Sequence, residues 1–339
     1  EHECREIQWA EITPSSPFYL FASSCPESDS EFAQWTPLNV LFVKNNVGFV
    51  TSRDAFVIDV DRGSLVDRIS RFSQGHSCGL NDTSSWSLQE TLRSVQLQPI
   101  DANAFRLCLY RPFDHRWICY DQRLLDRPVY DAARHMLSGS NIALVSTRQV
   151  TSENYQHALV TRLPIEFKAC SHDRNSQLCP LYLHAPQLDG TGQQSNLCVS
   201  FVDSLSHSLE SSATPPVVLH FVYSILHSPA YRFRYGEQLR REFARVPSNT
   251  APVMGTQLCR SGADLVALHL LEDDYPNASW NQPGTSTLNP LSTSITTFHD
   301  NGDRDVRTAG EQAKTSAASP DFGHGVGSVY TNDAATFLS

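Results

Sequence analysis

The sequence predicts an α+β fold: a mixed-sheet region, then a helical region, then a disordered C-terminal tail. Three observations carry this prediction. Short apolar runs separated by turn residues occupy the chain up to about residue 200, as is typical of strands and short helices. Longer apolar and amphipathic stretches follow between residues 217 and 271 and favour helices. From Asp273 to Ser339 polar residues and glycine dominate, which predicts a segment unable to bury a core.

The first hundred residues predict strands and short helices. The runs Pro17–Ala22 and Val47–Val60 predict strands, the second because apolar and polar residues partly alternate along it. Leu65–Phe72 and Leu88–Leu97 read as short helices. The polar run Gly75–Ser85 between them predicts a loop.

The next hundred residues predict a sheet. Phe105–Tyr120 reads as a strand pair interrupted at Pro112, because proline cannot donate to a central ladder. Tyr130–Leu137 is expected to be helical, and Ile142–Ser146 to be a buried strand. The remaining elements expected here are strands at Leu159–Leu163 and Leu181–His184 and a surface loop at Gln187–Asn196.

A helical subregion is predicted after residue 200. Val217–His227 is almost continuously apolar, which indicates a buried helix that ends or kinks at Pro229. Tyr231–Phe243 is amphipathic, with Arg232, Arg234, Arg240 and Arg241 as its basic members. Ala263–Leu271 predicts one more apolar helix.

Charge and cysteine usage narrow the class of protein. The net charge of −10 argues against nonspecific nucleic-acid binding by the whole surface. The stretch between Phe105 and Asn175, however, contains ten Lys and Arg and only seven Asp and Glu, so it is locally basic. The nine cysteines form no Cys-x-x-Cys pair, so we expect reduced thiols and no metal site. No apolar stretch reaches membrane-spanning length, which predicts a cytoplasmic protein that does not contact a membrane.

One family resemblance runs through most of the chain. Its strings in order are Trp9-Ala-Glu-Ile-Thr-Pro14, Asn46-Val-Gly-Phe-Val-Thr-Ser-Arg-Asp-Ala55, Tyr110-Arg-Pro-Phe-Asp-His-Arg-Trp117, Leu124-Leu-Asp-Arg-Pro128, Arg134-His-Met136, Asn141-Ile-Ala-Leu-Val-Ser-Thr-Arg-Gln149, Pro180-Leu-Tyr-Leu183, Leu226-His-Ser-Pro-Ala-Tyr231 and Leu265-Val-Ala-Leu-His-Leu-Leu-Glu272. In this order they resemble the C-terminal specificity region of type ISP restriction-modification enzymes. Those enzymes combine nuclease, translocase, adenine methyltransferase and target recognition in one polypeptide.

The resemblance implies a DNA-reading piece of a larger enzyme. It divides the chain into a linker region after the methyltransferase core (1–104), a target-recognition α/β region (105–200), a helical subregion (201–272) and a tail that departs from the family (273–339). The base-flipping, methyl-donor and phosphate-loop motifs are not found, so we expect no catalytic residue here. S-adenosylmethionine, ATP and Mg²⁺ would belong to the parent's other parts. The implied partners are double-stranded DNA and the parent's methyltransferase domain.

Candidate DNA contacts lie in the central basic window. Sequence reading requires side chains that present paired donors or acceptors to base edges, while other groups grip phosphates. Turns before a helix and residues that follow a buried strand favour binding. These criteria select Arg111, Arg116, Arg127, Tyr130, Thr147, Arg148 and Gln149. For Arg116 an internal pair with Asp114 is the favoured alternative, and Asp126 could instead serve only to cap the turn beside Arg127.

Two further sequence segments have alternative interpretations. Arg53 and Asp54 form a secondary site that could approach DNA or the methyltransferase core, although an internal ion pair of Arg53 is favoured. Glu166-Phe-Lys168 matches the Glu-x-Lys half of a metal-dependent nuclease motif, which makes a small nuclease the alternative function. A degenerate, non-catalytic interaction module is the third possibility.

Overall fold

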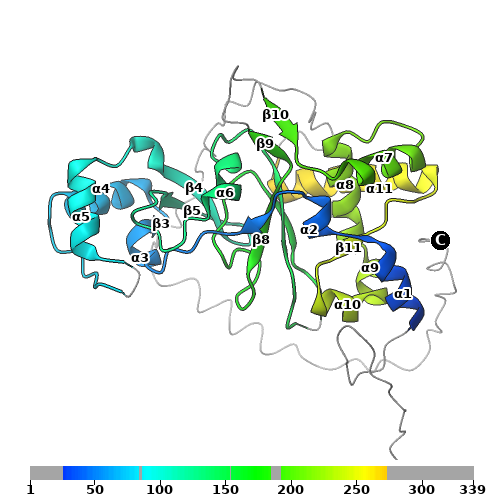
Figure 1. Cartoon of the computed structure of the whole chain (residues 1–339), viewed down its shortest axis with the longest axis horizontal. Coiled ribbons are helices and arrows are strands. Elements are labelled where there is room, and N and C mark those ends of the chain that lie inside the picture. Colours follow the sequence, from blue (N-terminus) through cyan, green and yellow to red (C-terminus); the bar gives the residue numbers. More distant parts are fainter. Residues whose placement is uncertain (1–25, 84–85, 153, 185–191, 273–339) are drawn as a thin grey trace, which may run out of the picture. The chain divides into compact units, whose positions relative to one another are not determined.

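The structure, a computed structural model, describes residues 26–83, 86–152, 154–184 and 192–272 (Figure 1). The chain separates into two compact units, Glu1–Ala278 and Ser279–Ser339, and every described residue belongs to the first. The strand predicted at Pro17–Ala22 and the tail predicted from Asp273 lie outside the described residues. Within the first unit the chain is an α+β protein with small antiparallel sheets, which confirms the predicted fold class.

A three-stranded antiparallel sheet forms the first core. Its strand order is β3 (Ile58–Asp59), β5 (Asp114–Cys119), β4 (Phe105–Arg111). Helices α3 (Asp54–Val57), α4 (Arg62–Ser73) and α5 (Leu88–Leu97) accompany it, with a short 3₁₀ turn at Ala102–Ala104. Phe56, Leu65, Ile69, Val95 and Ile118 share one buried cluster. This core therefore combines residues from both sides of position 104/105, where the sequence predicts a domain boundary.

Side-chain caps explain the two helices that the sequence predicts here. The Asp61 carboxylate accepts a hydrogen bond from the Ser64 backbone N–H at 2.6 Å and begins α4. The Ser87 hydroxyl oxygen accepts one from Glu90 N–H at 3.4 Å and begins α5. Such caps satisfy backbone donors that have no partner within the helix. Both predicted helices are confirmed, and residues 75–82 between them form no helix or strand.

The long strand predicted at Val47–Val60 is wrong. Only its two ends are strands, β2 (Asn46–Val47) and β3, whereas the middle turns into helix α3. Ser52 has a left-handed φ of 53°, and the Thr51 hydroxyl donates to the Asp54 carboxylate. This local hydrogen bond offers the backbone a turn in place of a ladder. Partial apolar alternation was a weaker signal than the polar tetrapeptide that interrupts it.

A four-stranded antiparallel sheet forms the second core. Its order is β2, β8 (Ser176–Pro180), β6 (Ala143–Thr147), β7 (Ala158–Thr161). All five residues of the inner strand β6 are buried, which confirms the buried strand predicted at Ile142–Ser146. The sequence does not predict strand β8 because Ser-Gln-Leu-Cys-Pro lacks β-branched and aromatic residues; strands on both sides hold it in the sheet.

Smaller elements connect this sheet to its surroundings. Helix α6 (Tyr130–Ala133) and the 3₁₀ turn η2 (Arg134–Met136) confirm the helical prediction for Tyr130–Leu137. Strands β9 (Tyr182–His184) and β10 (Gln193–Ser195) pair with each other. The predicted surface loop at Gln187–Asn196 is therefore wrong over its last residues. Asn196 is buried there because its side-chain amide donates to the Pro180 carbonyl at 2.7 Å.

Helices dominate the remainder, which includes the stretch after residue 200 where the sequence predicts helices. They are α1 (Pro26–Gln34), α2 (Leu38–Leu41), α7 (Val199–Ser208), α8 (Pro215–His227), α9 (Pro229–Arg234), α10 (Gly236–Arg241) and α11 (Pro252–Leu270), with strands β1 (Thr36–Pro37) and β11 (Arg245–Val246) paired beside them. The single helix predicted at Tyr231–Phe243 is corrected to two. They break at Tyr235, whose buried ring packs on Phe32 and Trp35. Among the described residues, no helix is both long and apolar enough to cross a bilayer.

An extended segment at residues 164–166, followed by a turn at 167–168, joins the two sheets. The Glu166 N–H donates to the Leu109 carbonyl of β4 at 3.0 Å, and the Phe49 N–H donates to the Ile165 carbonyl at 3.0 Å. Gly48 allows this close approach, since a Cβ atom on it would lie 2.6 Å from the Glu166 carbonyl carbon. The segment thereby fixes the relative positions of residues from both sheets.

Gly48→Ala is expected to destabilise the fold by about 1–3 kcal/mol, because the added methyl group meets backbone that cannot rotate away. Gly236→Ala is the matched control, since a Cβ atom there would meet nothing within 4 Å. Urea unfolding of both variants measures the difference. Equal stability of the two variants would contradict a tight contact between residues 48 and 166.

Candidate nucleic-acid interface

Arg111 and Arg116 lie in a cluster around Tyr110 at the β4–β5 hairpin. Their guanidinium carbons lie 4.0 and 4.1 Å from the centre of the Tyr110 ring. Arg116 pairs with Asp114 at 2.7 Å, and Arg111 pairs with Glu166 at 2.5 Å. Both arginines are thus neutralised within the protein, so any contact with DNA would require them to share or exchange these partners. The internal Asp114–Arg116 pair anticipated from the sequence is present.

Glu166 is the buried partner in this cluster. Its side chain is only 8% exposed, and burial raises the pKa of this carboxyl group against the opposing hydrogen bonds from Lys168 N–H and Arg111. The Lys168 ammonium points elsewhere, 5.0 Å from the centre of the Phe167 ring. The two residues of the nuclease-like motif therefore do not converge on one point. Among the described residues, no three His, Cys, Asp or Glu side chains gather to hold a metal ion.

The secondary candidates Arg53 and Asp54 also face inward. Arg53 is buried, donates to the Leu124 carbonyl at 2.7 Å and stacks over the Trp86 ring at 4.0 Å. Burial lowers the pKa of Arg53. Asp54 accepts a hydrogen bond from the Tyr110 hydroxyl at 2.8 Å and so tethers α3 to β4. These contacts give both residues a structural role.

Several other candidates gather at one end of the four-stranded sheet. We call Arg127, Arg148, Gln149, Phe167 and Lys168 the sheet-end surface. Ser176 organises it: this buried residue pairs with Thr147 in the β6–β8 ladder, and its N–H donates to the Phe167 carbonyl at 2.8 Å.

Arg127 and Gln149 reach this surface through backbone contacts. Arg127 exchanges two backbone hydrogen bonds with Val50, at 2.8 and 3.0 Å. The Gln149 side-chain amide donates to the Arg241 carbonyl at 3.0 Å, which places α10 beside it. Arg148 follows Thr147 directly and is exposed. The surface thus joins residues that are far apart in the sequence.

The other two predicted contacts differ in accessibility. Tyr130 begins α6 and is 45% exposed, so its ring is available to a partner. Thr147 is 1% exposed and its hydroxyl group has no hydrogen-bond partner among the described residues. The sequence predicts that Thr147 follows the buried strand, whereas Thr147 is the last residue of β6, an inner strand between β8 and β7. Thr147 consequently lies inside the sheet, and the accessible residues begin at Arg148.

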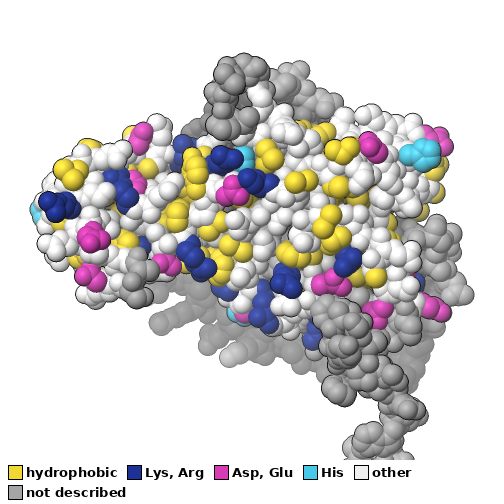
Figure 2. Space-filling model, viewed as in Figure 1, with side chains coloured by type: hydrophobic (Ala, Val, Ile, Leu, Met, Phe, Trp, Pro, Cys, Tyr) yellow, Lys and Arg dark blue, Asp and Glu magenta, His cyan; other side chains and the backbone are white. Residues whose placement is uncertain are grey.

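The charge of the sheet-end surface is not balanced locally. Arg127, Arg148 and Lys168 take part in no ion pair within the described part of the chain, in contrast to Arg111, Arg116 and Arg123. Figure 2 shows basic side chains gathered over the middle of this face, around the lower end of β8, with few acidic ones between them. Nearby Asp173 is engaged with the Thr151 and Ser171 hydroxyl groups, which lower the pKa of its carboxyl group to about 2.

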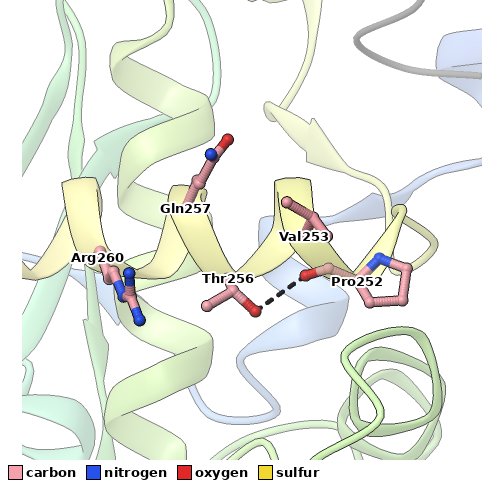
Figure 3. Close-up of a pocket in the computed structure, with 5 residues that line it drawn as sticks. All are labelled: Pro252, Val253, Thr256, Gln257 and Arg260. Atoms are coloured by element: carbon pink, nitrogen blue, oxygen red, sulfur yellow. Dashed lines mark hydrogen bonds between the residues drawn. The ribbon is translucent and has the colours of Figure 1, made fainter.

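A shallow hollow elsewhere collects none of the candidate residues. It has a volume of about 310 Å³ and is lined by Pro252, Val253, Thr256, Gln257 and Arg260, all from α11 (Figure 3). The Thr256 hydroxyl is used within the helix, where it donates to the Pro252 carbonyl at 2.9 Å. One helix supplies the whole lining, so the hollow is a surface depression.

Phe167 and Lys168 are members of the surface that the sequence did not select. Lys168 was considered only in the nuclease-like motif, and Phe167 only as the residue between its two members. Their role depends on Arg127, which lies about forty positions earlier and has its guanidinium carbon 5.2 Å from the Phe167 ring centre. A signal was present in the sequence, since Phe167 is adjacent to a lysine and cations commonly lie over aromatic rings.

This chain belongs to the family of the Type ISP C-terminal specificity domain, which matches residues 40–337. The match confirms the family that the sequence resembles. It begins later than the resembling strings and continues to residue 337, through the segment after Asp273 for which the sequence predicts a departure from the family. No curated protein matches the sequence.

Three solved structures share this fold. The cryo-electron microscopy structure of the DrdV–DNA complex has a TM-score of 0.60 at 20% identity and covers 78% of this chain and 28% of that one. The ATP-dependent Type ISP restriction-modification enzyme LlaBIII bound to DNA has a TM-score of 0.57 at 18% identity, over 70% and 16%. A nuclease-deletion mutant of the Type ISP enzyme LlaGI with a DNA substrate mimic has a TM-score of 0.55 at 19% identity, over 78% and 21%. The chain spans less than a third of each.

Proposed function

We propose that this chain recognises a DNA sequence as part of a type ISP restriction-modification enzyme, and that the sheet-end surface contacts the double helix. One observation carries the proposal: three exposed or half-exposed cations at the same end of the four-stranded sheet have no carboxylate partner in the described part of the chain, although the whole protein has a net charge of −10. A cationic surface on an acidic protein favours a polyanionic partner at that surface. Family membership and the DNA in all three similar structures support the same function.

Each candidate then has a distinct role. Arg148 extends from the end of a rigid inner strand, so its guanidinium group can present two donors to a guanine edge. Gln149 offers a side-chain amide beside it, and Tyr130 at the start of α6 suits a phosphate contact. The parent enzyme would supply the methyltransferase domain and bind S-adenosylmethionine, ATP and Mg²⁺. Its methylation and cleavage of DNA are part of this proposal.

Arg148→Ala is expected to weaken binding to the recognised sequence by about 1–3 kcal/mol, because a bidentate base contact is lost. Binding to random DNA should change little. Arg93→Ala is the control, since Arg93 is an exposed arginine on α5 outside the sheet-end surface. Fluorescence anisotropy measures both affinities, with one duplex that carries the recognised sequence (the selected duplex, obtained by selection from a random pool) and with random duplexes. An equal loss on both duplexes would contradict base reading by Arg148.

A further inference from the structure

The position of the Phe167 ring is set by backbone bonds on both sides. The Phe167 N–H donates to the Phe49 carbonyl at 2.9 Å, and the Phe167 carbonyl accepts from Ser176 N–H at 2.8 Å. The residues around it come from three separate parts of the chain. Arg127 and Lys168 both place their cationic groups over this ring, at 5.2 and 5.0 Å from its centre. An aromatic ring therefore holds two cations in defined positions.

These two cations share one aromatic ring and are not paired with a carboxylate in the described part of the chain. Because each lies about 5 Å from the same ring centre, their charges are at most about 10 Å apart, which is near the screening length at physiological salt. Neither has an ion pair among the described residues. The neighbouring Asp126 accepts a hydrogen bond from the Ser52 hydroxyl at 3.1 Å. An anion bound beside the ring would be attracted by both cations.

We propose that Arg127 and Lys168, held over Phe167, form a clamp for the phosphodiester backbone of DNA. This inference rests on the function proposed above. Contacts between cation and ring restrict two long side chains before binding, which lowers the entropy lost when they grip a phosphate. Ser176 couples the clamp to the reading position, since it bonds to Phe167 and pairs with the residue that precedes Arg148. A phosphate contact at this place fixes the register in which Arg148 meets a base.

The salt dependence of DNA binding tests the clamp. For the full 339-residue chain, Arg127→Ala and Lys168→Ala should each reduce the slope of log Kd against log salt concentration by about 0.9. Their affinity losses should be equal on selected and random duplexes. Phe167→Leu should weaken binding with the slope unchanged, because both charges remain. Arg93→Ala serves as the control, and circular dichroism verifies that each variant is folded.

Three outcomes separate the possibilities. Unchanged slopes in both alanine variants would overturn the clamp even if the wild-type chain prefers the selected duplex. Losses confined to the selected duplex, again with unchanged slopes, would also overturn it, since the two residues would then read bases. A wild-type chain that binds both duplexes equally would contradict sequence recognition, and the slopes would still decide whether the clamp holds phosphate.

Discussion

Gly262→Leu is expected to lower the free energy of unfolding by about 3 kcal/mol or more, the largest effect of any single substitution considered for this chain. Helices α8 and α11 lie side by side (Figure 1), and Gly262 is the point where their backbones meet. A Cβ atom on residue 262 would lie 2.5 Å from the carbonyl carbon of His220 and closer still to its oxygen. Backbone in a helix cannot rotate aside, so the helices would have to separate.

Urea unfolding of Gly262→Ala and Gly262→Leu measures this effect as a graded series. The exposed neighbour Ser261 provides the control, because Ser261→Ala adds no contact on the same helix and should stay within about 0.5 kcal/mol of the wild type. If Gly262→Leu were as stable as Ser261→Ala, the close packing of α8 on α11 would be contradicted.

Stability is also expected to fall steeply as the pH drops from about 6.5 to 4. Burial lowers the pKa of four histidines, His135, His220, His227 and His269, to about 4. In the unfolded chain these groups titrate near their usual value of about 6.5. Between the two values the unfolded state binds more protons, so protonation draws the equilibrium toward unfolding. The full contribution is present above pH 6.5 and is lost as the pH approaches 4.

Two of these histidines make hydrogen bonds that require a neutral ring. The His227 Nε2–H donates to the Ala158 carbonyl at 3.1 Å, and Nδ1 accepts from the Arg232 guanidinium at 3.2 Å. His135 Nδ1 accepts from the His184 backbone N–H at 3.0 Å. A proton on either Nδ1 would replace an attractive contact with a repulsive one.

The free energy of unfolding, measured by urea titration at pH 7.5, 6 and 4.5, should therefore decrease by several kcal/mol, since each pKa unit corresponds to about 1.4 kcal/mol per group. His227→Gln should flatten this dependence, whereas the exposed His207→Gln should leave it unchanged. A free energy that is constant from pH 7.5 to 4.5 would show that these rings titrate alike in both states.

Elements with a complete local signal could be predicted from the sequence. The helix at Leu88–Leu97 has a serine cap and apolar residues at helical spacing, and the strand at residues 143–147 begins with three apolar residues and is buried throughout. Strand β8 could not be predicted, because its residues favour no strand and its place depends on hydrogen bonds to β2 and β6. The break at Tyr235 likewise depends on distant aromatic rings.

The residues of the candidate interface also divide into those that local sequence identifies and those whose role depends on distant partners. Arg148 could be selected because it follows a buried strand directly, and that location is a local property. The sequence could not predict that Arg111 is paired within the protein, since its partner Glu166 lies 55 positions away in the sequence. Lys168 was missed for the same reason: its significance comes from Arg127 and from the ring that both residues share. Pairing across the fold decides which basic residues remain available to a partner.

Selection from a pool of random DNA duplexes tests the central claim most directly. The full chain is bound to the pool at low and at physiological salt, and the retained duplexes are amplified and sequenced over several rounds. We expect one short motif to be enriched by the wild-type chain, with the enrichment at one or two positions lost in Arg148→Ala, because base contacts specify sequence while phosphate contacts do not. A pool that is retained by the wild-type chain and remains random after selection would contradict sequence recognition by this domain.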